Sequence, residues 1–513
     1  MIKISSKIQR IESEEIANGS AIDLINELTE ELIDISQLKR EKYPFRKEYS
    51  DKLINKIKAK TGKSLISLED LSGPWILKFN ETGCKILTNL MMFIKEKYGI
   101  DRTLRKDGVN FYLINDSIIK GNCSLTVDTI RKYFKFLQKQ KINISGMNDI
   151  HKRAIQIKTS IKSKPIKING LPINMKDEKW ALIFGIILDT HLRKFEFVAE
   201  DRDFAQQVRL SFREVGIEPY FQNKGNLTKI KGHSIISHLI NFGGIETNKK
   251  QLIANNHLPS WMFLCSKKYH GILLSKFIDT EGYVPKGKNG VRIAQSSFIE
   301  INEPERQFVL TNSKTNFIKP VNVASQSIVF SKLNKILKEK VLSNPPLILV
   351  SSQLLLRKYK INSTVYPIHL YISSNNIASA GWHLAIFGFN NLKNLNDLCG
   401  KYLSIKYKKD ALKNILEQQK SECLPLGLRI NYYLANAKQI QNAKGYFTTK
   451  DLIKVTNKKK KTVYNTVGYL AKLKLIKTID KVNSSKFWVL TEKSHKILEK
   501  TCNNKEQFDH LFR

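Results

Sequence analysis

An apolar stretch that ends in two acids and a glycine constrains this chain most. It reads His270-Gly271-Ile272-Leu273-Leu274-Ser275-Lys276-Phe277-Ile278-Asp279-Thr280-Glu281-Gly282-Tyr283-Val284. The apolar run predicts a buried helix, and Gly282 predicts its end through a left-handed conformation. Asp279 and Glu281 then stand at the negative end of the helix dipole, where carboxylates lower stability unless a cation compensates. Oxygen ligands in such a place suit Mg²⁺, although on its own this pattern is more often an ordinary helix end.

A second stretch of the same kind lies about 90 residues earlier, at Ala181-Leu182-Ile183-Phe184-Gly185-Ile186-Ile187-Leu188-Asp189-Thr190-His191-Leu192. Together the two stretches resemble the paired motifs of the LAGLIDADG homing endonuclease family. The segment from Leu274 to Gly282 is similar to the second motif in its Asp-Thr-Glu-Gly form. Pro259-Ser260-Trp261 precedes it, as in many members, and Gly185 aligns with the packing glycine of the first motif.

Two positions depart from the family pattern. Thr190 stands where the first motif has its acid, and Asp189 lies one place early, so Asp189 either takes over that role or the half-site is lost. Lys276 stands where the family usually has a small residue at the helix interface. A lysine there must snorkel to solvent or splay the helices, so we expect the two motif helices to pack less tightly than in the family.

The resemblance extends over residues 176–415 and implies an α+β fold of two αββαββα-like repeats. The motif helices would pack about a pseudo-twofold axis, above curved antiparallel sheets that straddle duplex DNA. The segments that carry this likeness are the helix and hairpin of 204–233, the strand Val291–Ser296, the strand Gly381–Gly388 and the closing helices of 391–412.

The activity that the resemblance implies is site-specific, metal-dependent hydrolysis of both strands of double-stranded DNA. Glu281 and Asp189 would be the catalytic acids that hold Mg²⁺ or Mn²⁺, and Gln295 would order the attacking water. Arg292 would contact DNA from the strand after the second motif. His191 and His270 are weaker candidates as general acids or ligands, since neither occupies a motif position of that kind.

The charge balance agrees with a nucleic-acid partner. Lys and Arg outnumber Asp and Glu by 86 to 46, which gives a net charge of +40 and a field that attracts polyanions. No apolar signal core or membrane-length apolar run is present, so we expect a protein of the cytoplasm or nucleoid that does not bind a membrane. The six scattered cysteines suggest neither a zinc site nor a disulfide framework. Both motifs lie in one chain, which predicts a monomer.

The flanks of the core predict accessory segments. Residues 1–150 read as mainly helical, and 114–140 resembles the second half of a helix-turn-helix, with an ordinary capped amphipathic helix as the equal alternative. Residues 151–175 are basic and read as a linker.

Residues 426–500 predict three helices and a hairpin, the order of a winged helix. Its recognition helix would begin at a basic run, where positive charge is unfavourable unless an anion binds. The residues expected to contact DNA are Lys458, Lys459, Lys460, Lys461, Thr462, Tyr464 and Asn465.

Three functions remain open at this point. A DNA endonuclease of the homing type is the leading hypothesis and rests on Glu281. A cleavage-deficient transcriptional regulator on the same scaffold is favoured by Thr190 and by the winged helix. An intron maturase would use the same scaffold on RNA, while an intein is disfavoured because the chain opens with Met.

Overall fold

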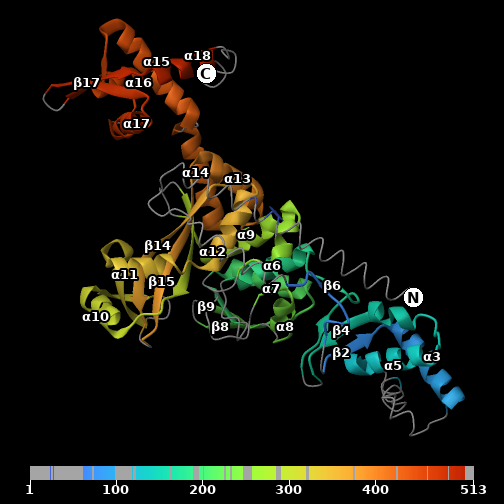
Figure 1. Ribbon diagram of the computed structural model, residues 1–513. Coiled ribbons are helices and arrows are strands. Elements are labelled where there is room, and N and C mark those ends of the chain that lie inside the picture. The colour runs from blue at the N-terminus through green and yellow to red at the C-terminus, as the bar shows by residue number, and fades with distance from the viewer. Residues whose placement is uncertain are drawn as a thin grey trace. The chain divides into compact units, whose positions relative to one another are not determined.

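The protein folds as two compact units, residues 1–416 and 417–513, each of mixed helix and sheet (Figure 1). The structure is a computed structural model. It describes residues 23–24, 27, 62–71, 74–98, 118, 123–160, 163–188, 196–199, 201–224, 227–231, 234–245, 257–284, 290–318, 323–373, 376–422, 426–458, 460–482 and 485–502. The α+β class predicted from the sequence is confirmed. In the described part of the chain, no helix is long and apolar enough to cross a membrane.

In its described residues, the N-terminal part of unit 1 contains a four-stranded antiparallel sheet, of order β3-β2-β4-β5, together with helices. Its elements are β2 (Ile76–Phe79), α3 (Glu81–Tyr98), β3 (Ser124–Thr126), α5 (Val127–Lys139), the 3-10 helix η2 (Met147–Arg153), β4 (Ala154–Lys158) and β5 (Ile166–Lys167). A further pair, β1 (Leu65–Ile66) and β6 (Ile173–Asn174), is also antiparallel.

The segment 151–175, which we predicted to be a linker, belongs to this folded region. Strand β4 pairs with β2 on one side and with β5 on the other, because Ala154, Ile157 and Ile166 supply buried apolar side chains between the basic ones. Within 114–140, the expected helix is present as α5, capped by the Thr126 hydroxyl. Strand β3 precedes it directly, and most of residues 114–122 lie outside the described part, as do nearly all of residues 1–61.

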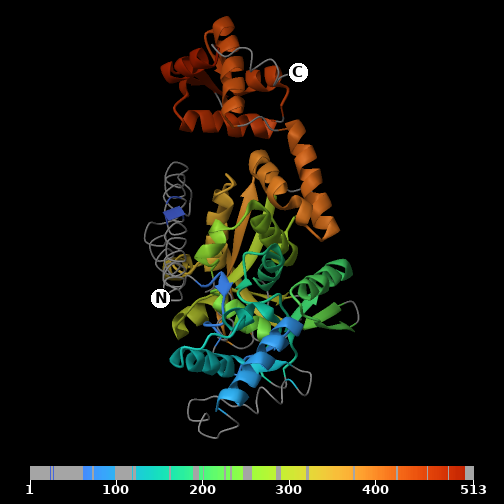
Figure 2. The same cartoon turned by 90° about the vertical axis from the view of Figure 1, so that its right-hand side faces the viewer.

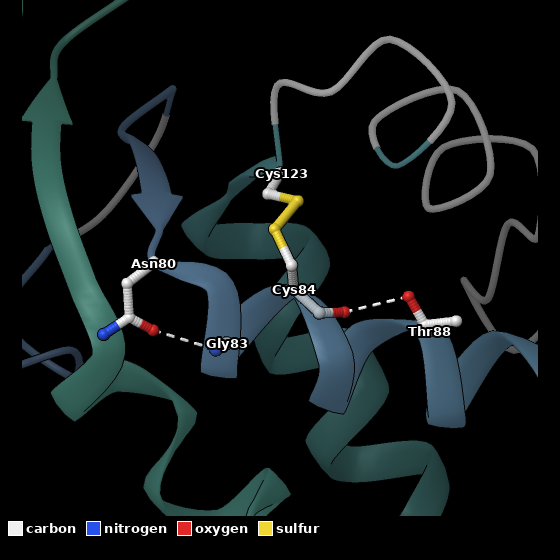
Figure 3. The surroundings of a disulfide bond; sticks show 5 residues. All are labelled: Asn80, Gly83, Cys84, Thr88 and Cys123. Atoms are coloured by element: carbon white, nitrogen blue, oxygen red, sulfur yellow. Dashed lines mark hydrogen bonds between the residues drawn. A yellow bond between two sulfur atoms is a disulfide. The ribbon is translucent and has the colours of Figure 1, made fainter.

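Cys84 and Cys123 form a disulfide between the first turn of α3 and the residue before β3, with their Cα atoms 5.6 Å apart (Figure 3). The sequence had suggested no disulfide, because the two cysteines are 39 positions apart and show no spacing pattern. Fold topology brings them together instead: β3 is the neighbour of β2, and α3 follows β2 after one residue.

The described residues of the first-motif region form a small antiparallel sheet of order β7-β9-β8 and three helices. Its elements are α6 (Glu178–Ile187), β7 (Glu196–Ala199), α7 (Arg202–Glu214), β8 (Tyr220–Lys224), β9 (Leu227–Lys231) and α8 (Ser234–Phe242). The predicted hairpin is β8–β9. Phe221 and Ile230 are register partners on the inner face, whereas Gln222 and Lys229 are partners on the opposite face.

The region of the second motif contains a larger antiparallel sheet of order β10-β11-β15-β14-β13-β12. Its elements are η4 (Ser260–Leu264), α9 (Lys267–Glu281), β10 (Gly282–Tyr283), β11 (Gly290–Phe298), α10 (Glu303–Asn312), β12 (Lys314–Ile318), β13 (Val323–Val329), η5 (Phe330–Lys332), α11 (Lys335–Leu342), α12 (Leu347–Arg357), β14 (Ser363–Ile372), β15 (Ala378–Phe387), α13 (Phe389–Cys399), η6 (Gly400–Tyr402) and α14 (Lys406–Glu422).

The alternation of side chains gives the larger sheet two different faces. One face is apolar and belongs to the core, with Ile293 and Leu384 as buried register partners. The other face is polar and half-buried, and it carries Arg292, Tyr366 and His383. In their described parts the two motif regions are unequal, since the first sheet has three strands and the second has six.

Unit 2 has a hydrophobic core of its own, which includes Phe447, Leu470 and Trp488. Its elements are α15 (Leu426–Lys444), β16 (Phe447–Thr448), α16 (Thr449–Thr456), α17 (Lys460–Lys472), β17 (Ile476–Val482), β18 (Ser485–Leu490) and α18 (Glu492–Cys502), and its sheet has the order β16-β18-β17. Figure 2 shows it in orange to red as one compact body. The predicted order of three helices followed by a hairpin is present, with one short strand and one closing helix in addition.

Candidate functional site

The two motif helices, α6 and α9, pack directly on each other, and Gly185 lies at their closest approach. A methyl group at Gly185 would lie 2.5 Å from the Leu273 carbonyl oxygen and 2.7 Å from Cβ of Lys276. Such distances exclude any side chain at this position unless the helices separate. The tight contact is the opposite of the loosened interface that we predicted from Lys276.

Lys276 does not reach solvent, although a lysine at this interface was expected to snorkel or to splay the helices. Its side chain is 5% exposed, and its ammonium group donates hydrogen bonds to Asp279 Oδ2 at 3.1 Å and to the Tyr402 carbonyl at 2.9 Å. It also donates to the Ser404 hydroxyl. Burial lowers the pKa of Lys276, while the charge of Asp279 opposes that shift. The lysine is tolerated because its charge is neutralised inside the protein.

Asp279 is a structural acid that ties α9 to the start of α14. Its carboxylate accepts hydrogen bonds from the backbone N–H groups of Ser404 at 2.9 Å and Ile405 at 3.2 Å, in addition to the one from Lys276. These N–H groups lie directly before α14, where helix starts favour an anion. Of the two acids at this helix end, Asp279 is therefore committed to the scaffold.

Lys408, in the first turn of α14, is a residue that the sequence analysis missed. Its side chain is 4% exposed, and its ammonium group donates to the carbonyl oxygens of Ile278 at 2.9 Å and Asp279 at 2.6 Å. This is the cation that compensates the negative end of α9. The only available signal was the basic pair Lys408–Lys409 in a segment resembling the closing helices, and the pair does not reveal which lysine is buried.

Gly282 ends α9, but not through the left-handed conformation that we predicted. Its backbone is extended, with φ −80° and ψ 142°, and its N–H donates to the Ile278 carbonyl. A methyl group here would lie 2.4 Å from that same carbonyl oxygen. The glycine is required because the backbone turns back closely over the last helical turn.

Glu281 is the last residue of α9 and is half-buried. Its expected partner Asp189 follows directly on Leu188, the C-cap of α6, but Asp189 lies outside the described residues, together with Thr190 and His191. Among the residues that the structure does describe, no group of three or more His, Cys, Asp or Glu side chains could hold a metal ion.

Strand β11 brings the ends of α6 and α9 to one place. Gly282, which follows Glu281, is the register partner of Ile293, and Gln295 lies two residues farther along the same face of β11. Gln295 Nε2 donates to the carbonyl oxygen of Leu188 at 3.5 Å. Two residues of strand span about 7 Å, so β11 contacts the ends of both helices within a short length.

The ends of α6 and α9 offer oxygen atoms of the kind that a hard divalent cation prefers. The Leu188 carbonyl and the Glu281 carboxylate both lie where helix dipoles end in negative charge. Mg²⁺ binds oxygen ligands and needs only one or two carboxylates because it keeps several waters. Of the two acids expected to hold Mg²⁺ or Mn²⁺, Glu281 lies within the described residues, and its carboxylate is of the donor type that these ions prefer.

Arg292 lies on the polar face of the larger sheet, opposite to the face of Gln295. Its guanidinium group stacks over the Phe387 ring at 5.7 Å from the centroid. Neighbouring strands place His383 beside Tyr366, with ring centroids 5.9 Å apart. Burial, and secondly the charge of Arg292, lower the pKa of His383 to about 4. The face therefore offers hydrogen-bonding and aromatic groups with few charges.

His270 is fully buried in α9 and forms part of the core. Its ring nitrogens contact the Met262 carbonyl and the Tyr359 hydroxyl. Burial lowers its pKa to about 4. The position gives His270 a structural role, remote from the helix end where Glu281 lies.

In unit 2, the predicted DNA-contacting residues lie at the start of α17 and on its exposed side. The helix begins at Lys460, and Lys461, Thr462, Tyr464 and Asn465 are exposed, while Val463 and Val467 face the core. Lys458 is exposed as well, and Lys459 lies outside the described residues. Lys460 stands over the ring of Tyr464, 6.0 Å from its centroid.

Comparisons with known proteins give likenesses among solved structures. No protein-family model matches the chain, and no curated protein matches it. Among solved structures, the chain is similar to the crystal structure of I-DmoI in complex with DNA and Ca, at 11% sequence identity and a TM-score of 0.25. That match covers 47% of this chain and 100% of the other. A likeness of this size does not establish a family or a function.

Proposed function

We propose that unit 1 is a site-specific, metal-dependent endonuclease of double-stranded DNA of the LAGLIDADG homing type. The observation that carries this proposal is the close pairing of α6 and α9 at Gly185, with both helix ends reaching β11 between Ile293 and Gln295. A glycine at the contact and an acid at the end of the paired helix are what the two sequence motifs require. Glu281 is the acid that the likeness to the second motif assigns to catalysis, and Asp279 is held by the scaffold.

The roles proposed for the residues follow from their positions. Glu281 and Asp189 would hold Mg²⁺, which when bound activates water and stabilises charge on phosphate oxygens. Gln295, which donates a hydrogen bond to the Leu188 carbonyl at the end of α6, would orient a water molecule. Arg292 and the polar sheet face around it would contact base edges or phosphates of the duplex.

Unit 2 is proposed to be a winged-helix domain that binds DNA and extends the recognised site. Its support is the order of elements and the position of the basic run at the start of α17. Helix-start N–H groups bind phosphate, and an anion there would remove the unfavourable interaction of the lysines with the helix dipole.

A regulator that binds DNA without cutting it is the second candidate. Thr190 favours the regulator, because this chain has a threonine where the family's first motif has its acid. A randomised duplex library distinguishes the endonuclease from the regulator. The protein is incubated with the library in Mg²⁺, and the bound duplexes and the cleaved duplexes are recovered and sequenced separately. We expect cleaved products with a common sequence from the native protein. Enrichment of a bound sequence without cleaved products would contradict the endonuclease and support the regulator.

The matched variants for this experiment are Glu281→Gln and Glu300→Gln. The first replaces the proposed metal ligand, and the second replaces an exposed acid after β11. We expect Glu281→Gln to remove cleavage while binding selectivity stays, and Glu300→Gln to behave like the native protein.

A further inference from the structure

Helices α9 and α14 cap each other's ends. The Asp279 carboxylate of α9 accepts the N–H groups of Ser404 and Ile405, which lie before α14. In return, the Lys408 ammonium of α14 donates to the last-turn carbonyls of Ile278 and Asp279. The carboxylate lies at the positive start of α14 and the ammonium group lies at the negative end of α9, so both contacts are favourable and hold the two helix ends together.

These contacts provide hydrogen-bond partners for backbone groups that have no partner within the helix at a helix end. The last carbonyls of an α-helix have no N–H partner within the helix, and ends without other partners fray. Ile278 O accepts two hydrogen bonds, one from the Gly282 N–H and one from Lys408. Both groups hold the turn from which Glu281 projects, and Lys408 does so from a helix that is distant in sequence.

Burial shows how strongly Lys408 depends on these contacts. The side chain is 4% exposed, and a buried ammonium group is costly unless its hydrogen bonds are made. A methionine of similar length would fill the same space but would leave the Ile278 and Asp279 carbonyls without this donor. Arginine would keep the charge and several donors.

We propose that Lys408 is a positioning residue for Glu281, which it holds at a fixed place by capping the last turn of α9. The inference rests on the proposed function, in which Glu281 is a metal ligand. Lys408 itself touches neither DNA nor metal in this account. Because a displacement of about 1 Å in a reacting group can lower a rate by about 100-fold, a loosened helix end is expected to act on the chemical step.

The test compares Lys408→Met and Lys408→Arg with Lys413→Met, an exposed lysine of the same helix. Single-turnover cleavage of the selected duplex in Mg²⁺ gives the chemical rate, and DNA binding is measured separately. We expect Lys408→Met to lower the rate by about 100-fold, with DNA affinity unchanged. Lys408→Arg should recover most of the rate, and Lys413→Met should match the native protein.

Amide hydrogen exchange gives a second measurement that does not depend on cleavage. In Lys408→Met, the Gly282 amide should exchange roughly tenfold faster, while amides in the middle of α9 keep their native rates. Equal acceleration along the whole helix would mean general destabilisation and would overturn the positioning role. A native cleavage rate in Lys408→Met would overturn it too.

The two proposals fail in different ways. If the native protein does not cleave, or if Glu281→Gln still does, the proposed function is wrong, and exchange at Gly282 alone decides whether Lys408 holds the helix end. If the native protein cleaves and Glu281→Gln does not, but Lys408→Met matches the native rate, then only the role of Lys408 is wrong.

Discussion

At the scale of single residues, the buried pair of Lys276 and Asp279 determines whether the helix interface can close. The Lys276 side chain lies against Gly185, and its charge is neutralised three residues further on in the same helix. A buried ion pair contributes little compared with a well-packed apolar pair, but the loss of one partner is strongly destabilising. The pair should therefore behave as a unit.

Substitution of Asp279 tests this coupling. Asp279→Asn leaves the Lys276 ammonium buried without its carboxylate, and we expect it to lower the free energy of unfolding by about 3 to 5 kcal/mol. Lys276→Met combined with Asp279→Asn should recover part of the loss. Denaturant unfolding measures both, with the exposed Asp410→Asn as the control. Additive effects of the two substitutions would show that the pair is not coupled.

His270 predicts a pH dependence of stability. Its pKa is about 4 in the folded protein and near 6.5 when exposed, so the unfolded chain binds the proton more tightly. The contribution of the neutral His270 side chain to the free energy of unfolding is fully present above pH 6.5 and is lost as the pH falls toward 4. Between pH 7 and pH 5, the stability advantage of the native protein over His270→Gln should shrink by about 2 kcal/mol. An unchanged difference would contradict the burial of a neutral imidazole.

The resemblance to the two motifs predicted Gly185 and Glu281 as parts of a helix pair, but it could not predict the partners of the charged groups. Lys276 was expected to loosen the interface, because the sequence does not show that Asp279 and Ser404 reach the same place. Lys408 was missed for the same reason. Its carbonyl partners lie on a helix that ends more than a hundred residues earlier, and such contacts depend on tertiary packing.

At the scale of elements, α17 is the part of unit 2 with the clearest electrostatic consequence. DNA affinity falls as salt rises, and each lysine that neutralises a phosphate steepens the plot of log affinity against log salt concentration by about 0.9. Replacement of Lys460 and Lys461 by Ala should lower that slope by about 2. Replacement of Lys493 and Lys496 on α18 is the matched control. If both double variants have the same salt dependence of DNA affinity, Lys460 and Lys461 do not contact phosphates more than the control lysines do.

The order of the elements was more predictable than their pairing. The family resemblance of Val291–Ser296 and Gly381–Gly388 predicted β11 and β15, and the two strands are register neighbours. The strands of 151–175 were missed because lysines between Ile155, Ile157 and Ile166 gave the segment a linker-like composition. Their burial depends on pairing with β2, about 80 residues earlier.

At the scale of the whole molecule, the separate core of unit 2 predicts that it folds by itself. Residues 417–513 form one of the two compact units, and their core side chains come from all of its main elements. We expect the isolated unit to give a single cooperative unfolding transition. Loss of that transition, measured by circular dichroism on heating, would mean that the unit depends on unit 1.

We propose Glu281, at the end of α9, as the acid of a metal-dependent DNA endonuclease. Single-turnover cleavage of the selected duplex in Mg²⁺, with each strand followed separately, tests this role. We expect the native protein to cut, and Glu281→Gln, which still binds the site, to be slower by about 1000-fold or more. Cleavage by Glu281→Gln at the native rate, or tight binding by both proteins without cleavage, would show that Glu281 does not have this role.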